Sequence, residues 1–202
     1  MNQPALRGLV LAGGQSVRMG ADKAALLIDG RTLLARSVAL LSPLTTAVQV
    51  AIRPGQASDG LRRQFSLLID EASVPGPAGA LVAAWQHDPH AAWLVLACDM
   101  PALEHAALEV LVARRDPKRG ATAWQSAADG LPEPLCAIWE PVTLARLAAV
   151  ARQAGNGPVS PRAILAGADP LLLNPARPLA LRSVNTPADL RRYLESNDGH
   201  KP

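Results

Sequence analysis

Short apolar runs alternate with segments of helical periodicity along most of this chain, and this alternation constrains its fold more than any other feature. The pattern predicts strands over residues 9–12, 47–52, 65–69, 93–97, 121–124, 135–139 and 179–184, and helices over residues 32–41, 77–86, 103–114, 142–153 and 187–194. Such an alternation favours a mostly parallel sheet with helices on both faces, and continuously apolar strands are typical of such buried sheets. We therefore expect an α/β fold, a single-domain, three-layer α/β/α arrangement around a Rossmann-like, mostly parallel sheet.

The chain length indicates one domain. Its 202 residues suit a domain that we expect to span residues 1–196, with residues 197–202 as a frayed, disordered tail. No run of about 20 apolar residues is present. The apolar run at residues 8–12 leads into a glycine turn and not into a signal-peptide cleavage site. We expect a protein without a membrane span, located in the cytoplasm.

Cysteine content and net charge narrow the function classes. Cys98 and Cys136 lie in apolar runs, which favours buried free thiols in a reducing compartment over a disulfide or a metal pair. The formal net charge of +3, from 20 basic and 17 acidic residues, is too small to indicate a nucleic-acid partner, and no basic stripe with interleaved aromatic residues is present. The arginine pairs at 62–63 and 114–115 are interpreted as solvated helix faces.

Three features lie at the carboxyl ends of predicted strands. The pair Gly13-Gly14 ends the first strand, Asp70 ends the third, and Asp99 lies just beyond the fourth. Ligands of parallel α/β sheets bind beyond these strand ends, so we expect the three features to surround one ligand site. Taken singly, Asp70 also fits a solvated strand end, and Asp99 also fits a helix N-cap or loop acid.

The glycine turn after the first strand has the chemistry of an anion-binding loop. Gly13 and Gly14 let the backbone approach a ligand closely, and successive backbone N–H groups in such a turn attract anions. Ser16 can donate a hydrogen bond, while Arg18 and Lys23 add positive charge suited to a phosphate chain. The spacing matches neither a P-loop nor the Rossmann dinucleotide fingerprint. The same residues also fit a plain strand-to-helix turn with two surface cations.

Residues 11–23 read Leu-Ala-Gly-Gly-Gln-Ser-Val-Arg-Met-Gly-Ala-Asp-Lys. This segment resembles, at every fixed position, the signature Leu-Ala-Gly-Gly-x-Ser-x-Arg-Met-Gly-x-Asp-Lys of the molybdenum cofactor guanylyltransferase family. Further motifs resemble those of the family in the same order: Gly-Pro-Ala-Gly-Ala-Leu at 76–81, Cys-Asp-Met-Pro at 98–101, Pro-Leu-Cys-Ala at 134–137 and Asn-Thr-Pro-Ala-Asp-Leu at 185–190. The resemblance implies the nucleotide-diphospho-sugar transferase type of the expected fold.

The resemblance also implies a reaction. The family transfers GMP from GTP to molybdopterin, or to molybdopterin loaded with molybdenum, releasing pyrophosphate with Mg²⁺ as cofactor. The implied nucleotide-binding residues are Leu11, Ala12, Gly13, Gly14, Lys23, Asp70 and Asp99. The implied catalytic residues are Arg18 and Lys23, which would neutralise the triphosphate, and Asp99, which would bind Mg²⁺. Molybdoenzyme chaperones or the cofactor-insertion machinery are implied as partner proteins.

Some positions depart from the family's pattern or fit two interpretations. Some members carry Asn at the end of the second strand, where this chain has Ala51, with Arg53 two positions on. Residues 78–80, Ala-Gly-Ala, replace the frequent Leu-Ala-Gly but remain small. Asn185 either belongs to a helix start, with Thr186 as N-cap ahead of a proline, or contacts the acceptor or the metal.

Two alternative functions stay open at this point. One is a related transferase with another base or acceptor, such as a molybdopterin cytidylyltransferase or a sugar nucleotidyltransferase. The cytidylyltransferase loop usually reads Leu-Ala-Ala-Gly, whereas residues 11–14 read Leu-Ala-Gly-Gly, which favours guanine. The other is a nucleotide-binding module without catalysis, and the presence of both Lys23 and Asp99 argues against it.

Overall fold

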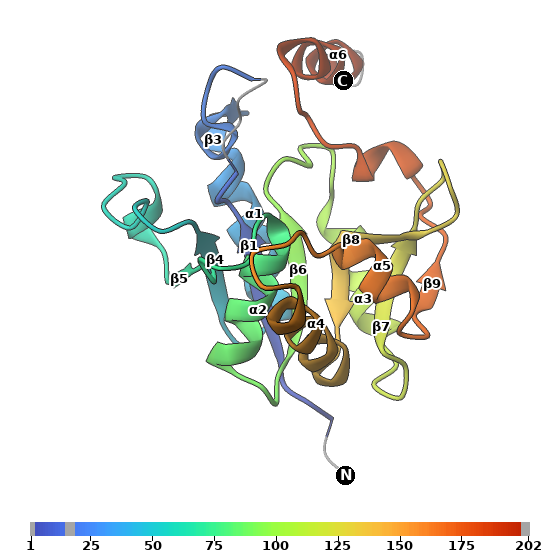
Figure 1. Cartoon of the computed structure of the whole chain (residues 1–202). Helices are drawn as coiled ribbons and strands as arrows, with labels where there is room; N and C mark the ends of the chain where they lie inside the picture. Colours follow the sequence, from blue (N-terminus) through green and yellow to red (C-terminus); the bar gives the residue numbers. More distant parts are fainter. Residues whose placement is uncertain (1–2, 15–18, 199–202) are drawn as a thin grey trace.

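A seven-stranded sheet runs through the centre of the molecule (Figure 1). The computed structural model describes residues 3–14 and 19–198. The sheet has the order β5-β4-β1-β6-β8-β7-β9. Its strands are β1 (Leu6–Leu11), β4 (Val48–Ile52), β5 (Leu67–Ile69), β6 (Ala92–Ala97), β7 (Ala121–Gln125), β8 (Pro132–Trp139) and β9 (Leu171–Leu173). Neighbouring strands are parallel except at β8, which is antiparallel to both β6 and β7, so the predicted mostly parallel sheet is confirmed.

Helices cover both faces of this sheet and make three layers (Figure 1). They are α1 (Leu33–Leu41), α2 (Pro77–His87), α3 (His105–Ala113), α4 (Pro141–Ala154) and α5 (Pro161–Ala166). Helix α6 (Pro187–Asp198) lies beyond the sheet, at the top of Figure 1. Side chains of α1 and α3 share one core cluster with Val10, whereas those of α2, α4 and α5 share a second cluster with Leu9. Successive strand residues face opposite sides of a sheet, so the predicted α/β/α architecture is confirmed. Across the described residues, every helix is too short or too polar to cross a membrane.

The last third of the chain departs from the predicted elements. The strand predicted over residues 179–184 is wrong, because Pro178–Leu181 forms a 3-10 helix, η4. Its first residue is a proline with φ close to the helical value, and Leu179 is 69% exposed, which leaves no buried strand face. Instead β9, which the apolar pattern does not predict, pairs in parallel with β7 at the edge of the sheet. Helix α6 continues to Asp198, two residues into the expected tail, and residues 199–202 lie outside the described part.

A short 3-10 helix and a hairpin connect β1 to α1. The 3-10 helix is η1 (Lys23–Ala25), and β2 (Leu27–Ile28) pairs antiparallel with β3 (Arg31–Thr32). The hairpin turn consists of Asp29 and Gly30, both with positive φ, as two-residue hairpins require. Thr32 then caps α1 by accepting a hydrogen bond from the Ala35 N–H. These local signals place Lys23 beside the end of β1.

Helix α2 begins very close to the loop that follows β5. The Glu71 N–H donates to the Gly79 carbonyl at 3.1 Å. A Cβ at Gly79 would lie 2.5 Å from the Val74 carbonyl oxygen, so this approach requires glycine. The rearranged small residues at 78–80 therefore keep a glycine where the backbone needs one.

Candidate active site

The carboxyl ends of β1, β4, β5 and β6 meet around a cavity of about 550 Å³. This volume lies within the usual range of small-molecule sites. The predicted nucleotide-binding residues all line it: Leu11, Ala12, Gly13, Gly14, Lys23, Asp70 and Asp99. Ser16 and Arg18, which the signature also contains, lie outside the described residues. The three strand-end features predicted to share one site are therefore brought together.

Lys23, Asp99 and Asn185 form a polar cluster at this cavity. The Lys23 Nζ donates to Asp99 Oδ2 at 2.9 Å and to Asn185 Oδ1 at 2.6 Å. The side chains of Lys23 and Asp99 are only 16% and 18% exposed. The Asp99 carbonyl also accepts a hydrogen bond from the Val184 N–H at 2.8 Å, which ties the segment before α6 to the turn after β6. An amine, a carboxylate and an amide from three distant parts of the chain thus lie in contact.

Asp99 fits a metal ligand better than a helix cap. Helix α3 has Glu104, not Asp99, at its N-cap. The Oδ1 atom of Asp99 is buried and accepts no hydrogen bond from the residues that the structure describes. Mg²⁺ commonly takes one or two carboxylates together with substrate phosphates. Within the described ranges no group of three His, Cys, Asp or Glu side chains could hold a metal ion, so a metal bound by Asp99 would need a ligand's oxygens as well.

The start of α6 explains how Asn185 is positioned. The Thr186 Oγ1 accepts a hydrogen bond from the Asp189 N–H at 3.1 Å, as predicted for an N-cap residue. The Asp189 Oδ2 accepts in return from the N–H groups of Asn185 and Thr186, at 3.1 and 2.9 Å. This reciprocal arrangement is a capping box. The capping role uses the backbone of Asn185 and leaves its side chain to contact Lys23. The helix-start interpretation of this segment is confirmed, whereas a contact of Asn185 with the acceptor or the metal stays a prediction.

Asp70 is a second carboxyl group in the cavity, and it is not a solvated strand end. Burial raises its pKa to about 7, and the nearby Arg53 guanidinium opposes the rise. Its Oδ1 is buried and has no hydrogen-bond partner among the described residues. A Cβ at Gly13 would lie 3.1 Å from both Asp70 Oδ2 and the Arg53 backbone nitrogen, so the glycine turn packs directly on this carboxyl. A carboxyl group that titrates near neutrality in a cavity is typical of functional sites.

The arginine pairs at 62–63 and 114–115 were predicted to be solvated. This prediction is wrong for Arg62 and for Arg115. The side chains of Arg62 and Arg115 are 1% and 4% exposed. Arg62 pairs with Asp22 and Asp59, and Arg115 pairs with Glu140. Asp22 and Glu140 lie 40 and 25 positions from their arginines, so no local spacing reveals these pairs. One sequence feature could have indicated Arg62: Asp22 is a fixed position of the signature, and a carboxylate fixed near the turn indicates a cationic partner close to it.

Both cysteines are buried free thiols, as predicted. Burial raises the pKa of the Cys98 thiol to about 12 and also raises that of Cys136. A thiol with such a pKa stays protonated at neutral pH and is a poor nucleophile. Cys98 is thus a buried thiol that packs in the wall of the cavity.

Comparisons with known proteins identify related sequences. The family model described as a MobA-like NTP transferase domain matches residues 8–171. A molybdenum cofactor guanylyltransferase of Pseudomonas paraeruginosa is 33% identical over 192 residues, 93% of each chain. A molybdenum cofactor biosynthesis bifunctional protein of Synechocystis is 32% identical over 190 residues, which are 94% of this chain and 54% of that protein. This chain thus spans about half the length of the bifunctional relative.

Solved structures share the fold. The molybdopterin-guanine dinucleotide biosynthesis protein A of Archaeoglobus fulgidus matches with a TM-score of 0.75 at 21% identity, over 96% of this chain and 99% of its own. A Mycobacterium tuberculosis protein in complex with manganese matches with a TM-score of 0.61 at 21% identity, over 95% of this chain and 99% of its own. At this identity the likeness extends to the backbone architecture alone.

Proposed function

Because this chain belongs to the family of MobA-like NTP transferase domains, we propose that it transfers the GMP unit of GTP to molybdopterin, free or loaded with molybdenum, and releases pyrophosphate. The observation that carries the proposal is the cavity in which the glycine turn, Lys23 and Asp99 meet. A phosphate oxygen of the acceptor bonds to the α-phosphorus of GTP, and the bond from that phosphorus to the pyrophosphate oxygen breaks. The acceptor phosphate is already an anion at neutral pH, so no general base is needed.

The residues of the cavity act by position and charge in this proposal. Transfer to phosphorus gains most from positioning and from neutralisation of phosphate charge. The backbone of residues 11–14 binds the nucleotide, Asp70 contacts it, and Lys23 neutralises phosphate charge together with Arg18. Support for these roles comes from the shared cavity of the described residues and from the match to the family signature.

We propose Mg²⁺ as the cofactor, with Asp99 as its protein ligand. Lys23 binds one oxygen of the Asp99 carboxylate at 2.9 Å, while the other oxygen is buried and unpartnered among the described residues. This donor set fits a cation that arrives with the triphosphate, since Mg²⁺ is usually shared between one or two carboxylates and phosphate oxygens. When bound, Mg²⁺ would neutralise the charge that develops on the leaving pyrophosphate.

The proposed preference for guanine depends on Gly13. In the cytidylyltransferase-like loop this position is alanine, whose Cβ would here lie 3.1 Å from Asp70 Oδ2 and from the Arg53 backbone nitrogen. Glycine therefore allows Asp70 and Arg53 to lie closer to the turn than alanine would. A guanidinium donates to O6 and N7 of guanine in nucleic-acid recognition, which makes Arg53 a suitable contact for this base.

Pyrophosphate release from GTP, CTP, ATP and UTP, measured with Mg²⁺ in the presence and absence of purified molybdopterin, tests the proposed reaction. We expect release with GTP only, and only when the acceptor is present. A strong preference for CTP would keep the chemistry but replace the base. Tight GTP binding without any release in the presence of acceptor would identify a nucleotide-binding module instead.

We also propose a cytoplasmic location and molybdoenzyme maturation proteins as partners. Two buried free thiols suit a reducing compartment. Affinity purification of the tagged chain from cells that make molybdoenzymes should recover a maturation factor. Recovery of the tagged chain alone would argue against a stable partner.

A further inference from the structure

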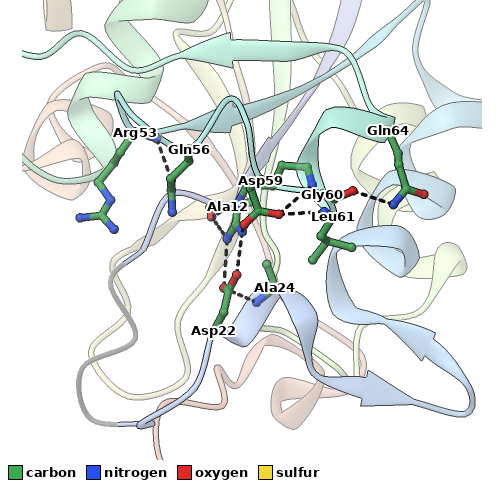
Figure 2. Close-up of polar contacts among 10 residues, drawn as sticks. Ala12, Asp22, Ala24, Arg53, Gln56, Asp59, Gly60, Leu61 and Gln64 are labelled. Atoms are coloured by element: carbon green, nitrogen blue, oxygen red, sulfur yellow. Dashed lines mark hydrogen bonds and ion pairs between the residues drawn. The ribbon is translucent and has the colours of Figure 1, made fainter.

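The buried side chain of Arg62 contacts one residue on each side of the glycine turn, Ala12 before it and Asp22 after it. Figure 2 shows Ala12, Asp22 and Asp59 gathered around these contacts. Arg62 begins η3 (Arg62–Gln64), in the connection between β4 and β5. Its Nε and Nη2 donate to the Ala12 carbonyl at 3.3 and 2.8 Å. Its Nη1 and Nη2 donate to the Asp22 carboxylate at 2.6 and 3.0 Å. Asp59, three positions before Arg62, also accepts from Nη1, at 2.8 Å, and so holds the guanidinium in place.

The bond to Ala12 sets the orientation of the peptide group that opens the turn. In a trans peptide the C=O and N–H bonds point in opposite directions. With the Ala12 carbonyl held by Arg62, the Gly13 N–H must point away from Arg62. The Ala12 N–H is held as well, by the Ala51 carbonyl at 3.1 Å. Arg62 thus fixes the direction of a backbone donor in the loop that would bind the nucleotide.

The bond to Asp22 sets the position of Lys23. The Asp22 Oδ1 accepts from the Ala24 N–H at 3.1 Å and caps η1, whose first residue is Lys23. Both oxygens of the same carboxylate are bonded to Arg62. A bidentate arginine–carboxylate pair fixes direction as well as distance. Arg62 therefore anchors the residue directly before the lysine that contacts Asp99.

We propose that Arg62 is a positioning residue for nucleotide binding, because it fixes both ends of the glycine-rich segment, at Ala12 and Asp22. The proposal rests on the proposed function in one respect, namely that the ligand of this segment is a nucleoside triphosphate. The guanidinium itself does not contact the nucleotide, and it acts through the Ala12–Gly13 peptide and through η1.

Charge adds to this positioning effect. Asp22 lines the cavity, and Arg62 neutralises its carboxylate. Hydrogen bonding to Asp22 raises the pKa of the Arg62 guanidinium further, so it is always charged. Without Arg62, the carboxylates of Asp22 and Asp59 would stand unneutralised beside a site for a triphosphate. Repulsion between these carboxylates and the triphosphate would then weaken the binding of GTP. It would have a smaller effect on the rate at which bound GTP reacts.

The first test compares Arg62→Met with Arg115→Met in steady-state turnover of GTP. Arg115 is a matched control, because it is also buried and bonds to a carboxylate, Glu140, and to a backbone carbonyl, Pro4, but none of these residues lines the cavity. We expect KM for GTP to rise by about tenfold to a hundredfold in Arg62→Met, the size of effect that misplacing a binding group by about 1 Å can have, with a smaller change in kcat. Arg115→Met should lower Tm and leave KM unchanged.

Two milder variants keep the test decisive if Arg62→Met does not fold. Arg62→Lys keeps the positive charge but lacks the planar fork of the guanidinium. We expect its KM for GTP to lie between those of the wild type and Arg62→Met. Asp59→Asn weakens the second carboxylate contact of the Arg62 Nη1, and Asp59 does not line the cavity. A rise in KM in Asp59→Asn would show that the effect passes through Arg62, whereas an unchanged KM in both variants would overturn the proposal.

Amide hydrogen exchange gives a measurement that needs no ligand. Loss of Arg62 should speed exchange at the N–H of Ala24 and of Ala12, while loss of Arg115 should leave both rates as in the wild type. Equal rates in Arg62→Met and wild type would overturn the proposal whatever the substrate is. Faster exchange in a protein whose wild type shows no turnover or binding of GTP would support the positioning role and contradict the proposed function instead.

Discussion

Asp70 is a single residue that makes the free energy of unfolding depend on pH, because burial raises its pKa to about 7. Burial favours the neutral form, so the folded state binds more protons than the unfolded state between pH 3.8, the ordinary pKa of an aspartate, and about pH 7. The stabilisation from neutral Asp70 is complete below pH 3.8 and is lost as pH rises through 7. We expect Asp70→Asn to remove this loss, which amounts to a few kcal/mol at most because the group is only partly shielded from solvent.

Thermal unfolding of wild type and Asp70→Asn between pH 4 and pH 8 checks this expectation. The difference in Tm between the two proteins should shift in favour of the variant as pH rises. Every other titrating group is common to both, so parallel profiles would show that Asp70 keeps its ordinary pKa in the folded protein.

Gly13 is a second single residue with a testable consequence. An alanine Cβ there would lie 3.1 Å from Asp70 Oδ2 and from the Arg53 backbone nitrogen, so these neighbours would have to shift by a few tenths of an ångström. We expect Gly13→Ala to push Asp70 and Arg53 away from the turn and to weaken GTP binding by roughly 1–3 kcal/mol, the usual cost of overpacking. Titration calorimetry with GTP and Mg²⁺ measures this change.

Gly60→Ala is the control for that measurement, because a Cβ at Gly60 would meet nothing within 4 Å and Gly60 does not line the cavity. We expect it to bind GTP as the wild type does. Unchanged affinity in Gly13→Ala would mean that the turn has room for a methyl group, and it would remove the argument for guanine at this position.

The residues of the site were predicted unequally from the sequence. Lys23 and Asp99 belong to recognisable motifs at strand ends, and both line the cavity. Arg62 and Arg115 were interpreted as solvated because each lies in a short basic pair. Asp59 lies only three positions before Arg62, but Asp22 and Glu140 are brought to Arg62 and Arg115 by the tertiary fold, and no local spacing indicates those two pairs.

At the level of secondary structure, helix α2 and the loop after β5 lie so close together that a Gly→Ala change in this helix should destabilise the protein, although such a change usually stabilises a helix. In an exposed helix Gly→Ala stabilises by roughly 0.5–1 kcal/mol, because glycine has more freedom to lose. At Gly79 the new Cβ would lie 2.5 Å from the Val74 carbonyl oxygen and 3.0 Å from that of Glu71, and backbone atoms cannot move aside cheaply. We therefore expect Gly79→Ala to destabilise the protein, seen as a lower urea midpoint; an equal or higher midpoint would show that α2 can shift away.

The strands were predicted best where they are buried. Strand β6 is fully buried and reads as an unbroken apolar run, and its predicted span of 93–97 differs from the observed one by a single residue. The edge of the sheet was predicted wrongly, because Leu171–Leu173 is a short run like many in loops, whereas the apolar segment at 179–184 begins with the 3-10 helix η4. A strand was predicted over residues 65–69 at the opposite edge, where β5 lies, so an edge position alone does not explain the error. The apolar run at 171–173 has only three residues, too few to show a strand period.

For the molecule as a whole, the cavity joins elements from both halves of the chain, so ligand binding should stabilise the entire fold. With GTP and Mg²⁺ at 100 times Kd, the free energy of unfolding should rise by about 2.7 kcal/mol. For a domain of this size that corresponds to roughly 5–10 °C in Tm. Differential scanning calorimetry measures the shift.

The same scans test the metal site. Chelation of Mg²⁺, or the change Asp99→Asn, should remove most of the shift in Tm caused by GTP. A shift of the same size without Mg²⁺ would contradict the assignment of Asp99 as a metal ligand.

The architecture and family were predictable from the sequence because both rest on short-range patterns. Apolar strands alternating with amphipathic helices specify the layers, and the motif after β1 identifies the MobA-like family, which the match over residues 8–171 confirms. Strand β8 is antiparallel to both of its neighbours. The Asp129-Gly130 turn before it indicates the reversal of the chain against β7, whereas no local pattern indicates that β8 also pairs with β6.

The contact between Lys23 and Asn185 joins positions 162 residues apart, and this distance has a consequence during protein synthesis. Translation adds about 5–20 residues per second, so the amide that steadies Lys23 is made roughly 8–32 seconds after the lysine. A nascent chain that has emerged only as far as β9 would carry the glycine turn, Lys23 and Asp99 without this restraint. The contact that completes this polar cluster can therefore form only after nearly the whole chain has been synthesised.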